Sequence, residues 1–169
     1  IYKKGLDCNI SIKPSHIGYD IDSNSLFTNL KMILQKAEST NNFLRLDMES
    51  SSLTSDTINM FQKYHKSSSH IGIVLQAYLH RTEDDLNLLA NKKITNLRIC
   101  KGIYKESPNI AIQDRTQINN NFLKLLRFAF NNNFFIGIAT HDTELLKQVY
   151  SLINELNVPS YKFEFQVLY

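Results

Sequence analysis

Six short apolar runs alternate with amphipathic stretches along this chain, and this alternation constrains the fold more than any other feature. The runs are rich in Ile, Leu, Val and Phe and alternate only weakly with polar residues, which is typical of strands buried on both faces. They are Asn9–Ile12, Phe43–Leu46, Ile71–Leu75, Leu97–Cys100, Phe135–Ala139 and Phe163–Val167. Their spacing is close to the roughly 30 residues of a βαβ unit. The pattern predicts an α/β fold with a parallel sheet and right-handed crossovers.

Apolar residues between these runs recur at helical spacing. They mark four helical faces: Leu26, Leu30, Ile33, Leu34 and Ala37; Ile58, Met60 and Phe61; Phe122, Leu125, Leu126 and Ala129; Leu145, Leu146, Val149, Leu152, Ile153 and Leu156. Thr82, followed by three acidic residues, marks the start of a further helix, since the helix dipole favours acids in the first turn. The candidate N-caps of the other helices are Asn24 or Ser25, Ser55, and Asp142 or Thr143.

The glycine content separates the possible α/β folds. The 169 residues contain 5 Gly, with neither a GxGxxG motif nor a Walker-A loop, so the two common nucleotide-binding folds are disfavoured. A TIM-like (β/α)8 barrel is favoured instead. A complete barrel typically needs ~250 residues, so we expect residues 1–169 to form one incomplete barrel domain with about six of the eight units.

The two ends of the chain fit this expectation of an incomplete barrel. The chain starts at Ile1 without methionine and stops at Tyr169, directly after the last apolar run. A final strand without a following cover leaves an apolar face exposed. We interpret the chain as a truncated or excised piece. The alternative is that a short terminal strand needs no cover.

Composition excludes several classes of protein. The net charge of +3 is modest and the basic residues are scattered, which argues against nucleic-acid binding. No apolar segment approaches the ~18–20 residues of a membrane span, and no signal-peptide pattern opens the chain. The two cysteines, Cys8 and Cys100, are isolated and have no metal-binding or redox spacing. We therefore expect a cytoplasmic protein without a metal.

Polar side chains stand in or just after each of the six runs. They are Lys13, Asp47, Glu49, Gln76, Arg98, Lys101, Thr140, His141 and Gln166. A parallel barrel or doubly wound sheet places its chemistry at the carboxyl ends of its strands. Because six runs share the pattern, we interpret these residues as a candidate site.

The segment from Arg98 to Tyr104 is the most unusual of these. Arg98 lies inside a strand, on the same side as Cys100 and Gly102, and an inward arginine needs an anionic or electron-rich partner. Gly102 permits close approach of a ligand to the backbone. We favour a functional role over an ordinary ion pair.

Judged one by one, the other residues also have ordinary explanations. Taken alone, Lys13 is better explained as a solvated lysine at a strand end than as a group that binds a carboxylate or forms a Schiff base. Arg45, Asp47 and Glu49 fall on one side of an extended chain, where a structural salt bridge is as good an explanation as function. Taken alone, Gln76 is better explained as an ordinary loop residue.

The remaining signals are weak in isolation. His141 lies near a predicted helix N-terminus, where phosphate binds readily. The sequence has no metal-ligand cluster and no Ser/His/Asp set with diagnostic spacing. A polar, mixed-charge set that includes amides suits a bound organic cofactor better than it suits hydrolysis.

Taken in order, six segments resemble the proline dehydrogenase family. They are Ser11–Ser15, Leu46–Glu49, Leu75–Tyr78, Arg98–Tyr104, Ala139–Asp142 and Phe163–Tyr169. The similarity covers essentially the whole chain and is greatest to the stand-alone bacterial enzymes. One such segment is moderately specific, and six in the same order are strongly specific.

The resemblance implies a distorted (β/α)8 barrel that holds non-covalent FAD and oxidises L-proline to Δ1-pyrroline-5-carboxylate, the first step of proline catabolism. It implies that a hydride passes to the flavin N5 and electrons pass on to quinone or the membrane electron-transport chain. The protein would then lie in the cytoplasm with peripheral contact at the inner face of the membrane.

The resemblance also assigns residues to the two sides of such a site. For the cofactor, it implies Gln76 at the flavin ring edge, Arg98 near N5, Cys100 lining the cofactor, Arg115 beside it, and Thr140, His141 and Gln166 around the ribose, phosphate or adenine. For the substrate, it implies Lys13 on the proline carboxylate, Asp47 and Tyr104 in the polar wall, and Leu168 on the proline ring.

The sequence also departs from the family pattern. The family's arginine-bearing final helix and its first strand are not found, so we expect weak proline binding, reduced retention of FAD and low activity. Ser50 and Ile103 differ from the commoner residues at their positions. Two alternatives stay open: a Schiff-base aldolase that uses Lys13 or Lys101, and a catalytically silent piece that packs against another chain.

Overall fold

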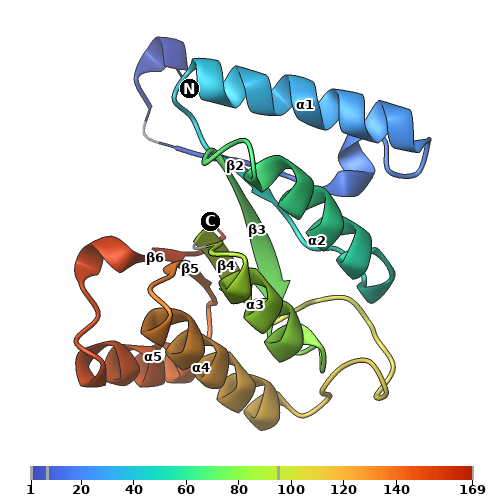
Figure 1. Cartoon of the computed structure of the whole chain (residues 1–169). Coiled ribbons are helices and arrows are strands. Elements are labelled where there is room, and N and C mark those ends of the chain that lie inside the picture. The colour runs from blue at the N-terminus through green and yellow to red at the C-terminus, as the bar shows by residue number, and fades with distance from the viewer. Residues whose placement is uncertain (1, 7, 95, 169) are drawn as a thin grey trace. The chain divides into compact units, whose positions relative to one another are not determined.

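The computed structural model describes residues 2–6, 8–94 and 96–168. The chain divides into two compact units, Ile1–Val74 and Leu75–Tyr169, and the division falls inside strand β3 (Ile71–Gln76). Figure 1 shows the first unit in blue to green and the second in green to red.

The first unit carries three parallel strands and two long helices. Its elements are η1 (Tyr2–Lys4), β1 (Ile10–Ile12), η2 (Pro14–Ile17), α1 (Ser23–Ser39), β2 (Leu44–Leu46), α2 (Ser51–His65) and most of β3. Ile10 pairs with Leu44, and Leu44 pairs with Ile71, so β2 lies between β1 and β3. The Tyr64 hydroxyl of α2 donates to the Phe27 carbonyl of α1 over 3.0 Å. This bond joins the two helices that flank β2 in sequence.

The second unit repeats the same β-α order. After the end of β3 come α3 (Thr82–Asn91), β4 (Asn96–Cys100), α4 (Arg115–Asn131), β5 (Phe135–Ala139), α5 (Thr143–Glu155), η3 (Ser160–Lys162) and β6 (Phe163–Gln166). β5 lies between β4 and β6, and both pairings are parallel. Helix α4 packs on β4 and β5 and beside α3 and α5, as Figure 1 shows.

All six predicted strands are present, five of them with one end shifted by one residue. The predicted faces of α4 and α5 are buried through Phe122, Leu125, Leu126 and Ala129, and through Leu145, Val149, Leu152 and Ile153. Each fully buried side chain of this kind stabilises the fold by about 1.5–3 kcal/mol. The parallel α/β class expected from the sequence is confirmed.

Two helix starts differ from the sequence prediction. Helix α1 is capped by Asp22, whose carboxylate accepts the Ser25 N–H at 2.8 Å, and not by Asn24 or Ser25. Helix α2 begins at Ser51 with Ser50 in the N-cap position, so Ser55 lies inside the helix. The first turns of α2 bury Thr54 and Thr57, whose polar side chains do not reveal the start of the helix to a search for apolar spacing. The predicted start of α3 at Thr82 and the predicted cap Asp142 are confirmed.

The strands differ in how they are buried, and this difference positions the candidate site. β2 and β3 are buried at every residue, as predicted for strands covered on both faces. β4 instead alternates: Leu97 and Ile99 are fully buried, while Arg98 and Cys100 are half-buried on the opposite face. Within the described part of the chain, no helix is both long and apolar enough to cross a membrane.

Candidate functional site at the carboxyl ends of the strands

In the first unit, Lys13 and Asp47 stand at the ends of neighbouring strands. The Asp47 N–H donates to the Ile12 carbonyl over 2.8 Å, which continues the β1–β2 ladder by one residue. Lys13 keeps an extended backbone, and Pro14 then begins the short helix η2. The ladder therefore sets a cation and a carboxylate side by side, both half-buried.

Glu49 and Arg45 have separate structural partners. The Glu49 carboxylate accepts the Ser15 N–H at 2.9 Å and the Ser15 hydroxyl at 2.7 Å, which ties the segments after β1 and β2 together. Arg45 is 1% exposed, donates to the Ile73 carbonyl and lies 4.9 Å from the Phe43 ring centroid. Since β2 ends at Leu46, the charged face expected for Arg45, Asp47 and Glu49 is not continuous along a strand.

In the second unit, Gln76 ends β3 with its side chain 2% exposed. Its main-chain carbonyl accepts the Thr82 hydroxyl at 2.5 Å, which fixes the start of α3. Its side-chain oxygen is buried and has no hydrogen-bond partner among the residues that the structure describes. A buried acceptor left unsatisfied costs about 1–3 kcal/mol, so this amide is suited to receive a donor from a bound molecule.

Arg98, Gln166 and Glu164 form a hydrogen-bonded line on the open face of β4 to β6. The Arg98 Nε donates to the Gln166 Oε1, and the Gln166 Nε2 donates to the Glu164 Oε1. Gly137 on β5 lies between them, in register with Arg98 on one side and Glu164 on the other. One partner of the inward arginine is therefore an amide backed by a carboxylate.

The loops after β3 and β4 are locked together around Tyr78. The N–H groups of Ala77 and Tyr78 donate to the carbonyls of Cys100 and Lys101, each over 2.8 Å. Gly102 has φ +107°, and a Cβ there would lie 2.1 Å from the Tyr78 ring. The expectation that Gly102 makes room for a ligand is corrected: the Tyr78 ring occupies that space.

Burial, reinforced by the negative charge of Glu106, raises the pKa of the Tyr78 hydroxyl to about 12. The loop after β4, which carries Glu106, also carries Tyr104, which is half-buried. The locked loops therefore fix the backbone on which Tyr104 stands.

Asp142 forms ion pairs with two cations at this end of the second unit, Lys101 and Arg115. Its carboxylate accepts the Lys101 Nζ at 2.5 Å, the Arg115 Nη2 at 2.9 Å and the Asn119 Nδ2 at 3.3 Å. The other oxygen caps α5 by accepting the N–H groups of Glu144 and Leu145.

The Lys101 and Arg115 hydrogen bonds hold the pKa of Asp142 far below its usual range. An ammonium held by a carboxylate does not act as a free amine nucleophile, so this pairing argues against Lys101 as a Schiff-base lysine.

The remaining predicted residues lie near this cluster. Thr140 is buried, and its hydroxyl accepts the Asp142 N–H at 3.1 Å. The His141 Nε2 accepts the Leu168 N–H at 3.0 Å, so the end of β6 is tied to the loop after β5. The Leu168 side chain is 88% exposed. Tyr169, the last residue of the predicted motif, lies outside the described residues.

Two contacts of the site were not predicted from the sequence. Glu164 accepts a hydrogen bond from Gln166, and Asp142 is shared by Lys101 and Arg115. Glu164 stands two positions before Gln166 in a strand, and residues two apart share a strand face, so this signal was available. Asp142 was identified as a cap, but its contacts with Lys101 and Arg115 join segments 41 and 27 residues away in sequence. Nothing local in the sequence indicates those contacts.

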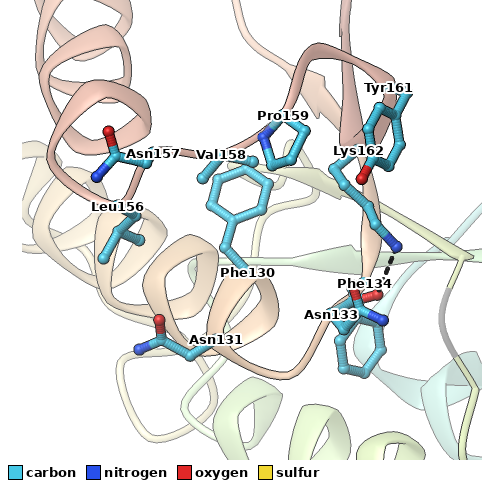
Figure 2. A pocket seen from close by; sticks show the side chains of 10 residues that line it. All are labelled: Phe130, Asn131, Asn133, Phe134, Leu156, Asn157, Val158, Pro159, Tyr161 and Lys162. Atoms are coloured by element: carbon cyan, nitrogen blue, oxygen red, sulfur yellow. Dashed lines mark hydrogen bonds between the residues drawn. The ribbon is translucent and has the colours of Figure 1, made fainter.

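A pocket at the opposite end of the strands carries none of this chemistry. Figure 2 shows residues that precede β5 and β6, among them Phe130, Asn133, Pro159 and Lys162. Its volume of about 130 Å³ is small beside the ~300–1,000 Å³ of usual ligand sites. The amino ends of barrel strands ordinarily serve stability. Within the described ranges, no three His, Cys, Asp or Glu side chains are grouped to hold a metal ion.

Comparisons with known proteins found a matching family and several relatives. The family model for proline dehydrogenase matches residues 3–169. Proline dehydrogenase 2 of Bacillus subtilis (strain 168) is 35% identical over 164 residues, which is 97% of this chain and 54% of that protein. Proline dehydrogenase of Deinococcus radiodurans is 30% identical over 170 residues, with 98% and 54% covered. The chain thus spans about half the length of the curated relatives it matches.

Solved structures give the same result for the fold. Proline utilization A from Bdellovibrio bacteriovorus superposes with a TM-score of 0.81 at 25% identity, over 95% of this chain and 20% of that one. Proline utilization A from Bradyrhizobium japonicum gives a TM-score of 0.78 at 18% identity, over 99% of this chain and 20% of that one. The TIM-like α/β fold expected from the sequence is confirmed by this likeness.

Proposed function

Because this chain belongs to the proline dehydrogenase family, we propose that it takes part in the FAD-dependent oxidation of L-proline to Δ1-pyrroline-5-carboxylate. The observation that carries the proposal is the 35% identity with an enzyme named proline dehydrogenase over 97% of this chain. The polar groups at the strand ends support it, because barrel enzymes place their chemistry there.

The cofactor side of the proposal fits the residues present. The unsatisfied amide oxygen of Gln76 suits the N–H of a flavin ring edge. Arg98 and Cys100 face the open side of β4, where Arg98 would approach N5 and Cys100 would line the ring. The chemistry that FAD supplies when bound is acceptance of the hydride from proline at N5 and onward transfer of the electrons to a membrane quinone.

The other cofactor residues would hold the remote part of the molecule. Thr140, His141 and Gln166 stand at the ends of β5 and β6, and Arg115 begins α4 beside Asp142. The Arg115 side chain is 77% exposed, so its remaining N–H donors are accessible to a phosphate. We propose that these four residues bind the ribose, phosphate or adenine.

The substrate residues are proposed one by one, and each would act in its own way. The Lys13 ammonium would pair with the proline carboxylate, and Asp47 and Tyr104 would complete the polar wall. The exposed Leu168 side chain would pack on the proline ring. The proline amine must be unprotonated to lose a hydride from its carbon, and neighbouring cations favour the neutral amine.

The test is a visible absorption spectrum of the protein purified with FAD, before and after anaerobic L-proline. We expect flavin absorption that bleaches with proline. Colour without bleaching would contradict proline oxidation, and a colourless sample would contradict FAD binding. Trapping of a carbonyl substrate by borohydride would instead support a Schiff-base enzyme.

A matched pair of variants tests the substrate residue. Lys13→Met should keep the flavin spectrum and raise the proline concentration needed for bleaching, because the carboxylate loses its cation. Lys31→Met makes the same change at an exposed position of α1 and should leave both unchanged. Equal proline requirements in the two variants would contradict the role of Lys13.

A further inference from the structure

The line from Arg98 through Gln166 to Glu164 crosses three strands within the second unit. Arg98 is on β4, and both partners are on β6, separated by two positions so that they share one strand face. The Arg98 Nε donates to the Gln166 Oε1, and the Gln166 Nε2 donates to the Glu164 Oε1. All three side chains are half-buried, where hydrogen bonds are electrostatically stronger than in water.

The chemistry of the two ends fixes the orientation of the amide in the middle. A guanidinium only donates hydrogen bonds, and an ionised carboxylate only accepts them. The Gln166 amide therefore presents its oxygen to Arg98 and its nitrogen to the other side, where the half-buried NH2 group needs an acceptor to hold the amide in place. Glu164 is that acceptor, and both bonds of the line are charge-assisted.

Gly137 gives the line the space that it needs. A Cβ at this position would lie 2.7 Å from the Gln166 Nε2 and 2.9 Å from its Cδ. A larger residue at the centre of β5 would push the amide out of the line between Arg98 and Glu164. The absence of a side chain at one strand position is thus part of the arrangement.

We propose that Glu164 is a positioning residue that holds the Arg98 guanidinium in one place by fixing the Gln166 amide over Gly137. The consequence for the cofactor rests on the function proposed above, which sets Arg98 beside the flavin N5. The line of hydrogen bonds itself does not depend on a bound cofactor. Gln166 then serves the cofactor through Arg98 as well as by direct contact.

The first experiment measures the line without any ligand. Nitrogen-15 NMR of the full 169-residue chain should show an Arg98 Nε–H signal that exchanges slowly with water, assigned by its loss in Arg98→Lys. Glu164→Met removes the acceptor at similar size and should abolish the protection. Glu164→Gln keeps an acceptor oxygen and should restore it. Gly137→Ala should abolish it by displacing the amide.

A matched control separates this effect from a general loss of charge. Glu155→Met makes the same change in the exposed Arg127–Glu155 ion pair of the same unit and should leave the Arg98 signal unchanged. An Arg98 signal that stays protected in Glu164→Met would overturn the proposal. So would equal loss of protection in Glu164→Met and Glu155→Met.

The second experiment measures FAD affinity by fluorescence titration of the same proteins. Glu164→Met should bind FAD on the order of tenfold more weakly, the value of one charge-assisted contact, and Glu164→Gln should bind nearly as the parent does. Loss of the Arg98 signal with unchanged FAD affinity would overturn the role at the cofactor. If the parent chain binds no FAD, the proposed function is refuted, and so is the role of Glu164 at the cofactor. The Arg98 NMR signal would still test whether Glu164 holds Arg98 in place.

Discussion

Replacing Asp142 with asparagine separates the two things that this carboxylate does. One oxygen caps α5 through the N–H groups of Glu144 and Leu145, and the other accepts from Lys101, Arg115 and Asn119. Asparagine caps helices as well as aspartate does. Asp142→Asn therefore keeps the cap and removes the charge, whereas Asp142→Ala removes both.

The expected cost follows from how exposed each partner is. The Asp142 side chain is 8% exposed and Lys101 23%, so their pair lies between a surface pair, worth about 0–1 kcal/mol, and a broken buried pair, which costs about 3–5 kcal/mol. The Arg115 side chain is 77% exposed and adds a few tenths at most. With loss of the charge at the helix N-terminus, Asp142→Asn should cost roughly 2 kcal/mol. Asp142→Ala should cost about 1 kcal/mol more.

The effect of Asp142→Asn on the free energy of unfolding should depend on pH in a defined direction. The pKa of Asp142 is lowered from 3.8 by Lys101 and Arg115, so below that value the unfolded chain binds more protons than the folded one. The stabilisation is therefore complete above the unfolded pKa and is lost as the pH falls toward the folded one. The difference between the parent and Asp142→Asn should be largest near neutral pH and should shrink as the pH falls below about 4.

The assay is urea unfolding of the parent and both variants at neutral and acidic pH. Glu144→Gln is the matched control, because it removes a neighbouring acid of the same turn whose Lys147 pair is exposed on both sides. It should change the free energy of unfolding much less than Asp142→Asn does. Equal stability of Asp142→Asn and the parent at neutral pH, or a gap that widens in acid, would refute the reasoning.

Two further predictions concern the locked loops. Gly102→Ala should destabilise the chain by roughly 2–4 kcal/mol in urea unfolding, because it combines φ +107° with a Cβ 2.1 Å from the Tyr78 ring; a change below 1 kcal/mol would contradict that contact. Because the pKa of Tyr78 is raised to about 12 from 10.0, the folded chain holds a proton that the unfolded chain loses, and stability should fall as the pH rises above 10. Tyrosinate absorbance at 295 nm should show an ionisation well above pH 10 that is absent in Tyr78→Phe. The same variant should flatten the alkaline fall in stability, and an unchanged slope would exclude Tyr78 as its cause.

Local sequence patterns predicted the strands and most helices well, for a physical reason. Strand Ile71–Gln76 is buried at every residue, so its composition is apolar up to the final Gln76 and visible in the sequence. The face of α4 repeats at helical spacing because it packs on β4 and β5. The start of α2 was missed because Ser50, Ser51, Ser52 and Ser55 are all competent caps, and local sequence does not choose among them.

The candidate site was predicted as a set of residues but not as a set of contacts. Arg98 was expected on an open strand face, and the alternation of burial along β4 agrees with that expectation. Its partner Gln166 lies 68 residues away and meets it only because β5 places Gly137 between the two strands. Likewise, the ring that fills the space above Gly102 comes from Tyr78 in another loop. Such contacts depend on strand register, which no local pattern contains.

Two strand glycines have an evolutionary consequence. A Cβ at Gly72 would lie 2.5 Å from the Arg45 Nη1, and one at Gly137 would lie 2.7 Å from the Gln166 Nε2. In each pair the large side chain fits only while its neighbour is glycine. The effect of a substitution at one position should therefore depend on the residue at the other, which is epistasis. An alanine at position 137 should become acceptable once residue 166 is shortened. An alanine at position 72 should become acceptable only when residue 45 is shortened and the Phe43 ring, whose Cζ would lie 2.7 Å from the new Cβ, also makes room. Drift at these sites must therefore pass through ordered multiple substitutions, which restricts the paths by which homologous sequences diverge.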